Sequence, residues 1–220
     1  MKSPELPGTP DIRSARREYG RAVLDEADAP SDPLVLFAAW LSEAVAAGIA
    51  EPTAMVLSTA ASDGGVSARV VLLKGVERNG FAFFTHYGSR KGRQLLANSN
   101  AALTFPWIAM ERQVRVEGKA VRLPRRESVA YFNDRPLESR ISACISPQSS
   151  IIPDRAFLDS IRQGFILDLG DRAPLCPPDW GGYVVRPVRI EFWQGREHRL
   201  HDRLLYRKTG RRWILERLAP

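Results

Sequence analysis

The sequence predicts a mainly antiparallel β protein with flanking α-helices, an α+β fold. Stretches of alternating apolar and polar residues follow one another along most of the chain, and a period of two is typical of strands with one buried face. Short turns rich in Gly, Asn and Asp join several of these stretches, which favours antiparallel pairing. Closing such a sheet into a barrel would remove its unpaired edges.

Two helices are expected ahead of the sheet. Residues 11–24 are charged and could form a short one. Asp32 and Pro33 mark the start of the second, because a capping side chain there precedes proline at the first helical position. Apolar residues then recur at helical spacing as far as Gly48, which ends the helix.

Strands and shorter helices alternate in the rest of the chain. A short helix is expected from Ser89, and residues 125–145 should be helical with a break at Pro136. Residues 146–178 contain five prolines and predict no single element. The expected strands are residues 53–60, 66–74, 81–87, 101–108, 113–123, 182–193, 203–208 and 212–218.

Composition indicates one domain in a soluble, cytoplasmic protein. Of the 220 residues, 44% are hydrophobic and 26% are charged, as in an ordinary globular chain. We expect residues 1–15 to form a flexible lead and residues 16–220 a single domain. The opening residues lack the apolar core of a secretory signal, and the most apolar stretch, residues 34–50, is too short for a membrane span. The two cysteines show no CxxC spacing, so no metal site is indicated.

The net charge of +7 indicates a protein that attracts anions. Nucleic acid, an anionic membrane and phosphorylated small molecules are all compatible with charge alone. Stacking on nucleic-acid bases has little support, because the aromatic residues stand mostly at core-like strand positions. The chain has no G-x-S-x-G elbow, HExxH, Walker loop or GxGxxG, so hydrolase, metalloenzyme and Rossmann-type interpretations lack support.

Two groups of residues are candidates for binding oxyanions. Arg90 and Lys91 lie where a strand enters a helix, and the free amides of a helix N-terminus suit a phosphate, although a solvated basic loop is the simpler interpretation. Tyr131, Arg135 and Ser139 are spaced four apart. They would share one helical face if the helix continued through the proline, and would form either a phosphate clamp or an ordinary polar surface.

Other polar residues are weaker candidates. Arg69 and Lys74 should point to opposite faces of their strand, so they serve one site only if the strand is irregular or a pocket wraps around its end. Gln113 fits a normal half-buried strand, and Gln148 and Ser149 fit a polar loop.

A final cluster lies near the C-terminus, in EFWQGREHRLHDRLLYR. Arg199, His201 and Arg203 occupy alternate positions there and should project from one face of one strand. His201 and Asp202 are adjacent and should point to opposite faces, which argues against an acid–base pair. A basic sheet protein with several oxyanion candidates and no evident nucleophile fits a phosphorylated cofactor that performs the hard chemistry itself.

Taken together, several stretches resemble the pyridoxine/pyridoxamine 5′-phosphate oxidase family. They occur in the family's order, and the match runs from about Arg16 to Pro220. The stretches are RREY at 16–19, RVVLLK at 69–74, GSRKG at 88–92, ERQVRVEGKA at 111–120, YFNDRP at 131–136, SPQSS at 146–150, WGGY at 180–183, and EFWQGREHRLHDRLLYR through to the terminal ERLAP.

This resemblance implies a split β-barrel homodimer with FMN at the subunit interface. It assigns the FMN phosphate and ribityl chain to Arg69, Arg90, Lys91, Gln148 and Ser149. It places the isoalloxazine ring near Val70, Val71, Leu72, Leu73, Lys74, Phe84, Thr85, Gln113, Trp193 and Arg203. It gives the substrate phosphate to Lys74, Tyr131, Arg135 and Ser139, the pyridine ring to Arg199 and His201, and an N-terminal cover to Arg16, Arg17 and Tyr19.

The reaction implied by the resemblance oxidises pyridoxine or pyridoxamine 5′-phosphate to pyridoxal 5′-phosphate. A hydride passes from the substrate to the flavin, and molecular oxygen then reoxidises the flavin and yields hydrogen peroxide. Arg199 and His201 are the expected catalytic residues. The chain's own contribution is mainly orientation, anchored by the remote phosphate.

The chain departs from the family pattern at a few positions. Arg140-Ile141-Ser142 stands where Gln-Ile-Gly is expected, Phe84 replaces the more usual tyrosine, and His86 stands where asparagine is common. Residues 153–178 look unlike the family's charged helix. Because Arg140 would add charge beside the proposed clamp, substrate preference and turnover are less firmly implied than FMN binding.

Two alternatives within flavin biochemistry stay open. A related flavin oxidase could act on a non-vitamin aromatic such as a dihydrophenazine, although the full phosphate clamp argues against it because a dihydrophenazine carries no phosphate. A non-catalytic carrier of flavin or pyridoxal phosphate would bind the same groups without turnover.

Overall fold

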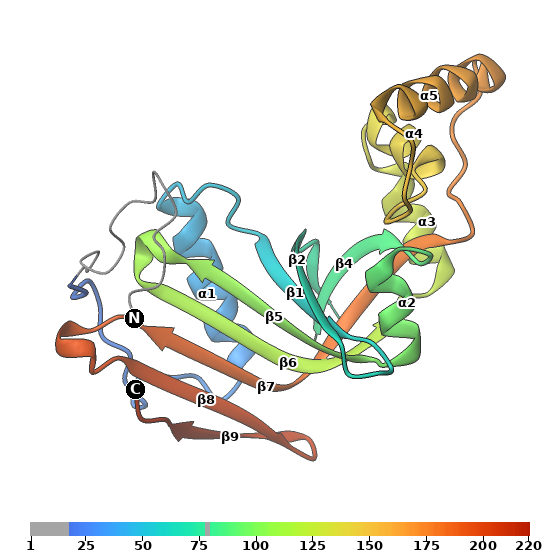
Figure 1. Ribbon diagram of the computed structural model, residues 1–220. Coiled ribbons are helices and arrows are strands. Elements are labelled where there is room, and N and C mark those ends of the chain that lie inside the picture. Colours follow the sequence, from blue (N-terminus) through green and yellow to red (C-terminus); the bar gives the residue numbers. More distant parts are fainter. Residues whose placement is uncertain (1–17, 78–79) are drawn as a thin grey trace, which may run out of the picture.

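A computed structural model describes residues 18–77 and 80–220, and their nine strands form one curled antiparallel sheet (Figure 1). Its main path runs in the order β2-β1-β5-β6-β7-β4-β3, while β8 pairs with β7 and β9. The strands are β1 (Ala54–Ala60), β2 (Val66–Leu72), β3 (Gly75–Glu77), β4 (Gly80–His86), β5 (Asn100–Trp107), β6 (Arg112–Arg122), β7 (Trp180–Gln194), β8 (Asp202–Thr209) and β9 (Arg212–Arg217). The predicted antiparallel sheet is confirmed.

Five α-helices flank the sheet in the described part of the chain. Helix α1 lies along the sheet, whereas α4 and α5 project away from it beyond α3 (Figure 1). The helices are α1 (Pro33–Ala46), α2 (Arg90–Ala97), α3 (Arg125–Asn133), α4 (Leu137–Ile145) and α5 (Arg155–Leu169). None of the helices in residues 18–77 and 80–220 is long and apolar enough to cross a membrane.

Helix α1 closes the main core, and the predicted cap starts it. The Asp32 carboxylate accepts a hydrogen bond from the Leu34 amide at 2.9 Å. The Phe37 ring lies 4.8 Å from both Phe81 and Phe105 (between ring centroids), and all three are fully buried. Burying a side chain of this size stabilises the fold by about 1.5–3 kcal/mol, so α1 is held mainly by its aromatic contacts.

Strand β7 pairs with a different strand near each of its ends, and with β6 along much of its length. It is 15 residues long and pairs with β4 from Trp180 to Val185 and with β8 from Arg189 to Gln194. Its pairing with β6 shifts register at Gly118, where an added Cβ would lie only 2.1 Å from the Arg186 carbonyl oxygen. Glycine therefore permits the irregularity at which the two longest strands change register.

Some local expectations are wrong. Residues 18–24 contain no helix, and residues 11–17 of that expected helix lie outside the described residues. Helix α5 lies within residues 146–178, for which no single element was expected. The five prolines of that stretch all lie outside residues 154–173, so they do not interrupt the helix. The short strand β3 was also unexpected; Gly75 continues the chain directly into it after Lys74.

Candidate functional site

A cavity of about 500 Å³ lies where β2, β4, α2, α3 and α4 meet. Its described lining includes four cationic side chains and no carboxylate. The lining residues are Arg69, Val70, Val71, Leu72, Lys74, Phe84, Thr85, Lys91, Tyr131, Arg135, Pro136, Ser139, Gln148 and Trp180. Twelve of these fourteen were predicted as site residues, so the fold brings most of the candidates from five separate stretches of sequence into one place.

Arg69 is fixed at the floor of the cavity by neutral partners. Its Nη1 donates to the Leu57 carbonyl at 3.1 Å and to Thr59 Oγ1 at 2.6 Å, and its Nη2 donates to Ser67 Oγ at 2.5 Å. Gln94 Oε1 accepts from both hydroxyls, at 2.7 Å and 2.8 Å. Burial lowers the pKa of Arg69, and the nearby Arg90 lowers it further. The guanidinium is therefore rigidly oriented, and no carboxylate of the described residues pairs with it.

Lys91 adds a second cation from the first turn of α2. Its Nζ donates to Gln148 Oε1 at 2.8 Å and to Thr85 Oγ1 at 3.3 Å. Burial lowers the pKa of Lys91, and repulsion from Arg69 acts in the same direction. An anion placed between these two cations would relieve that repulsion.

Arg69 and Lys74 reach the same cavity because strand β2 ends at Leu72, before Lys74. The Lys74 amide donates to the Ala82 carbonyl at 2.8 Å, which turns the chain toward β4. The pocket thus wraps around the end of the strand, one of the two conditions under which these residues could act together.

Part of the cavity wall is aromatic. The Tyr131 ring stacks on Phe84 at 3.8 Å with an interplanar angle of 17°, and Phe84 stacks on Trp180 at 5.6 Å. Burial raises the pKa of Tyr131, which keeps its hydroxyl protonated and able to donate. The wall offers flat apolar surface beside the cations.

Arg135 stands in this wall with an unused donor. Its guanidinium lies 4.8 Å over the Trp180 ring, and its buried Nη1 has no hydrogen-bond partner among the described residues. Burial lowers the pKa of Arg135. A buried guanidinium nitrogen without a partner is costly, so this donor indicates a ligand that accepts from it.

Tyr131, Arg135 and Ser139 do not share one helical face, because the helix breaks at Pro136 as predicted. All three nevertheless line the cavity, since the turn between α3 and α4 redirects the chain around it. Arg140, which departs from the family pattern, is not among the lining residues.

Three predicted residues near the cavity do not line it. Arg90 is exposed at the start of α2, Leu73 is buried in the hydrophobic core, and Ser149 lies exposed in a turn with φ 72°.

The prediction that Arg199, His201 and Arg203 project from one strand face is wrong. Strand β8 begins only at Asp202, and Arg199 lies in a short 3₁₀ turn, η2 (Glu197–Arg199), with a left-handed φ of 62°. His201 Nδ1 accepts from the Arg196 amide at 3.1 Å, which closes the loop before the strand starts. Arg203 Nε donates to Glu191 Oε1 at 2.8 Å and is not free.

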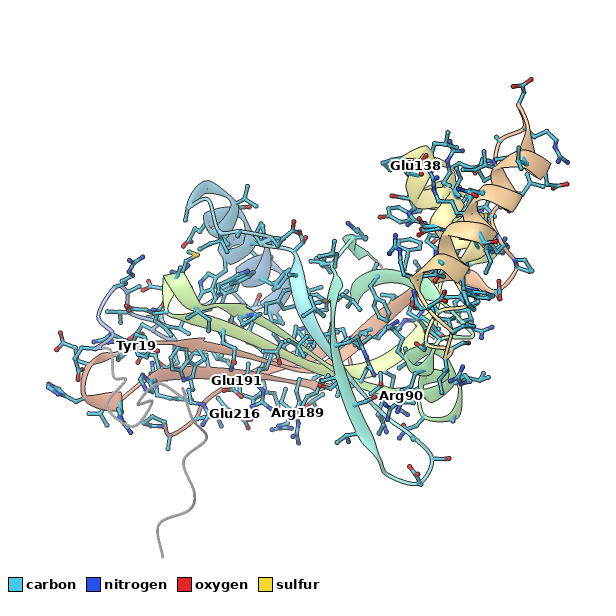
Figure 2. The ribbon with its side chains drawn as sticks, turned by 45° about the horizontal axis from the view of Figure 1, so that its top comes forward. Tyr19, Arg90, Glu138, Arg189, Glu191 and Glu216 are labelled. Atoms are coloured by element: carbon cyan, nitrogen blue, oxygen red, sulfur yellow. The ribbon has the colours of Figure 1, made fainter. Side chains whose placement is uncertain are left out.

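These residues form a second group at the other end of β7. The Trp193 ring lies 4.6 Å from His201, Tyr19 lies 5.9 Å from each of them, and Trp193 is the strand partner of both Gln113 and Arg203. At about 3.3 Å per residue, β7 covers about 40 Å between Trp180 and Trp193. Figure 2 shows Tyr19 far along the sheet from Arg90, which begins α2. Arg16 and Arg17 lie outside the described residues.

Sequence reasoning missed the residues that support the site. Trp180 begins the quoted WGGY motif, which is the signal that could have indicated it; its stacking on Phe84 follows only from the fold. Thr59, Ser67 and Gln94, which orient Arg69, carry no motif. The β1–β2 pairing sets Thr59 opposite Ser67, and helix α2 brings Gln94 within hydrogen-bond distance of both hydroxyls.

The chain is similar to known proteins over nearly its whole length. A family model for pyridoxamine 5′-phosphate oxidase matches residues 41–160, and a model for the pyridoxine 5′-phosphate oxidase C-terminal dimerisation region matches residues 180–220. A pyridoxine/pyridoxamine 5′-phosphate oxidase from Pseudomonas paraeruginosa (strain DSM 24068 / PA7) is 51% identical over 96% of this chain and 100% of its own length. One from Paracidovorax citrulli (strain AAC00-1) is 49% identical over 100% of this chain and 98% of its own.

Solved structures share the fold. PhzG from Burkholderia lata 383, solved with tetrahydrophenazine-1-carboxylic acid, has a TM-score of 0.85 and 34% identity, covering 92% of this chain and 100% of that one. A pyridoxamine 5′-phosphate oxidase-related, FMN binding protein from Nostoc punctiforme PCC 73102 has a TM-score of 0.67 at 16% identity, covering 87% and 98%, and supports the split-barrel fold alone. The full-length likeness and both matching family models show that the chain belongs to the pyridoxine/pyridoxamine 5′-phosphate oxidase family.

Proposed function

We propose that the chain is an FMN-dependent oxidase that converts pyridoxine or pyridoxamine 5′-phosphate to pyridoxal 5′-phosphate with molecular oxygen as acceptor. The observation that carries this proposal is the cavity lined by four cations, no carboxylate and an aromatic wall among the described residues. FMN and a B6 vitamer phosphate each bring an aromatic ring and a phosphate monoester, with about two negative charges near neutral pH. The cations of the lining suit the phosphates of FMN and of the vitamer, and the aromatic wall suits their rings.

The cations fall into two sets that match two phosphates. Arg69 and Lys91, with Gln148, stand on the β2 and α2 side and would hold the FMN phosphate and ribityl chain, with Arg90 and Ser149 nearby. Tyr131, Arg135 and Ser139 come from α3, α4 and the turn between them, and with Lys74, which follows β2, they would hold the substrate phosphate. The unpartnered Arg135 Nη1 supports this division, since a phosphate oxygen would satisfy it.

FMN, when bound, supplies the hydride acceptor and the reactivity toward oxygen. The chain's residues do the remaining work. The phosphate clamp fixes the substrate at a point remote from the reacting carbon, and the Phe84, Tyr131 and Trp180 rings exclude water beside it. Arg199 and His201 would hold the pyridine ring, with Tyr19 as part of a cover.

We also propose that each site is built from two copies of the chain. The cavity and the Trp193–His201 group lie at opposite ends of β7 in one chain, too far apart for one vitamer phosphate to touch both. Strand β2 ends the main path of the sheet and exposes Val66 and Val70 at 78% and 65%, and an uncovered apolar edge of this kind favours pairing. The match of residues 180–220 to a dimerisation region supports a homodimer.

A second candidate function is oxidation of a reduced phenazine, favoured by the structural likeness to PhzG. Its substrate would leave Arg135 and Lys74 without a phosphate. Oxygen consumption with pyridoxine 5′-phosphate, compared with a dihydrophenazine under the same conditions, distinguishes the two. Faster turnover of the phenazine would replace the B6 assignment.

An absorption spectrum tests the proposal as a whole. The purified protein loaded with FMN should lose its visible flavin bands on anaerobic addition of pyridoxamine 5′-phosphate and regain them in air. A flavin spectrum that the substrate never bleaches would indicate a carrier, and a chain that takes up no FMN would rule out both.

A further inference from the structure

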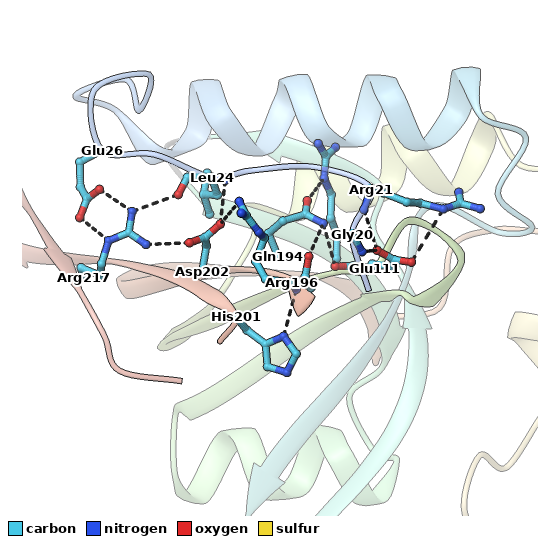
Figure 3. Close-up of polar contacts among 12 residues, drawn as sticks. Gly20, Arg21, Leu24, Glu26, Glu111, Gln194, Arg196, His201, Asp202 and Arg217 are labelled. Atoms are coloured by element: carbon cyan, nitrogen blue, oxygen red, sulfur yellow. Dashed lines mark hydrogen bonds and ion pairs between the residues drawn. The ribbon is translucent and has the colours of Figure 1, made fainter. Parts of the chain in front are cut away.

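Segment 18–24 has no regular secondary structure, yet side-chain carboxylates fix its backbone (Figure 3). The Gly20 and Arg21 amides donate to Glu111 Oε2 at 2.9 Å and 3.1 Å. The Leu24 amide donates to Asp202 Oδ2 at 3.1 Å. Hydrogen bonds to an ionised acceptor are stronger than neutral ones, so these two carboxylates determine where the segment lies.

Glu111 is buried, and hydrogen bonds to its backbone carbonyl hold it in place. It is 4% exposed and adopts a left-handed φ of 58° between the 3₁₀ turn η1 (Ile108–Met110) and β6. Its carbonyl accepts from the Gly195 amide at 2.7 Å and from Gln194 Nε2 at 3.3 Å. The residue is thus tied to the end of β7 by its backbone and to the N-terminal segment by its side chain.

Asp202 anchors the other end of the segment. Its carboxylate also accepts from Arg196 Nη1 at 3.3 Å and Arg217 Nη1 at 2.9 Å, while Arg217 Nη2 donates to the Leu24 carbonyl at 3.1 Å. These contacts hold Leu24 independently of Glu111.

Tyr19 immediately precedes the two amides that Glu111 holds. Its ring meets Trp193 edge-on, 5.9 Å away at 87°, and lies 5.9 Å from His201. An added Cβ at Gly195 would lie 2.9 Å from Tyr19 Cβ, so the approach is close. A shift of the Gly20–Arg21 peptide would move Tyr19 off both rings.

We propose that Glu111 is a positioning residue for the reaction: by holding the Gly20 and Arg21 amides it sets Tyr19 against Trp193 and His201 and keeps the N-terminal segment over that part of the site. This inference rests on the proposed function for its effect on turnover. The placement of Tyr19 itself follows from contacts within the chain and can be measured without substrate.

Amide hydrogen exchange of the purified protein tests the placement. In Glu111→Ala, exchange at Gly20 and Arg21 should rise about tenfold or more, while Leu24, held by Asp202, should change much less. Glu111→Gln keeps one acceptor oxygen and should fall between. The matched control is Arg21→Ala, which removes a side chain that is 60% exposed and lies 3.9 Å from Glu111; it should leave both amides unchanged. Unchanged exchange in Glu111→Ala would overturn the proposal.

A double-mutant cycle tests whether Glu111 acts through Tyr19. Glu111→Ala and Tyr19→Ala should each lower kcat/KM for pyridoxamine 5′-phosphate, and the double variant should be no worse than Tyr19→Ala alone. If the double variant instead loses kcat/KM by the product of the two single losses, the proposal is contradicted. If Glu111→Ala does not fold, Glu111→Gly, which suits the left-handed φ, takes its place in both experiments. A chain inactive on B6 phosphates would defeat the proposed function while the exchange result still stands.

Discussion

The two ends of β7 carry many cations, but they treat those charges in opposite ways. Around the cavity, Arg69, Lys74, Lys91 and Arg135 share a lining that contains no carboxylate among the described residues. At the other end, Arg203 pairs with Glu191, and Arg217 pairs with both Glu26 and Asp202. The four cations of the cavity are therefore suited to bind an external anion, whereas Arg203 and Arg217 are neutralised by carboxylates of the chain itself.

This difference suggests that the cations of the cavity bind ligands, whereas the paired cations at the other end of β7 hold parts of the chain in place. Uncompensated cations raise the free energy of the empty cavity, which a phosphate can recover. Paired cations contribute to the shape of the N-terminal segment and of the Trp193–His201 group. Arg199 is the exception at this end: it is exposed, and no carboxylate is seen to pair with it among the described residues, which fits a role toward substrate.

The largest effect is expected from Arg199→Ala. If this residue holds the pyridine ring, turnover should fall about a hundredfold or more while FMN stays bound. Steady-state kinetics with flavin content measured on the same sample check this. Unaltered kinetics would remove Arg199 from the mechanism and leave its end of β7 purely structural.

Arg69→Ala should weaken FMN binding about a hundredfold, because it removes a preoriented guanidinium. Fluorescence titration with FMN measures the effect. Arg207→Ala is the matched control, since Arg207 pairs with Glu216 on β9 and should leave FMN affinity unchanged. An equal loss of FMN affinity in Arg69→Ala and Arg207→Ala would mean that the overall charge of the protein, rather than the cavity, attracts the cofactor.

Arg135→Ala should raise the KM for pyridoxamine 5′-phosphate about tenfold to a hundredfold by removing charge-assisted hydrogen bonds. Activity on pyridoxamine itself, which lacks the phosphate, should change little. Arg126→Ala is the control, because Arg126 is exposed on α3, the helix just before the turn that carries Arg135. A null effect of Arg135→Ala would discredit the clamp.

The smallest effect concerns the paired end. The Arg217 guanidinium lowers the pKa of Glu26 from 4.5 to about 2. A lowered pKa in the folded state stabilises the fold above the unfolded value, and this contribution disappears as pH falls from about 4.5 toward 2. The melting temperature of the wild type should therefore be slightly higher than that of Glu26→Gln at pH 7, and the two melting temperatures should converge in acid. A difference in melting temperature that persists at pH 2 would mean that packing, rather than charge, causes the effect.

Local signals predicted much of this molecule. Asp32-Pro33 starts α1, Pro136 breaks a helix, and the alternating stretches became strands, because each signal acts within a few residues. Helix α5 was missed because prolines were counted over a long window, although Asp154 caps a proline-free stretch and accepts from the Phe157 amide.

The residues themselves suggested part of the site: Lys91 from its place at a helix start, and Tyr131, Arg135 and Ser139 from their spacing. The resemblance supplied the aliphatic and aromatic lining. The alternation of Arg199, His201 and Arg203 was misleading, since three residues are too few to establish a period and a 3₁₀ turn occupies the first of them. The partners of Arg69 and the bond from Glu111 to segment 18–24 depend on tertiary contacts across many residues. No short pattern encodes such contacts.

Mixing two impaired variants, assayed at a substrate concentration well below the KM of the Arg135→Ala variant, tests most directly whether the two ends of β7 from different copies form one site. Arg135→Ala and Arg199→Ala chains, unfolded together and refolded with FMN, should recover activity to about a quarter of wild type. Half of randomly formed dimers are mixed, and each mixed dimer holds one intact site. Activity that stays at the level of the separate variants would mean that Arg135 and Arg199 act within one chain or in different processes.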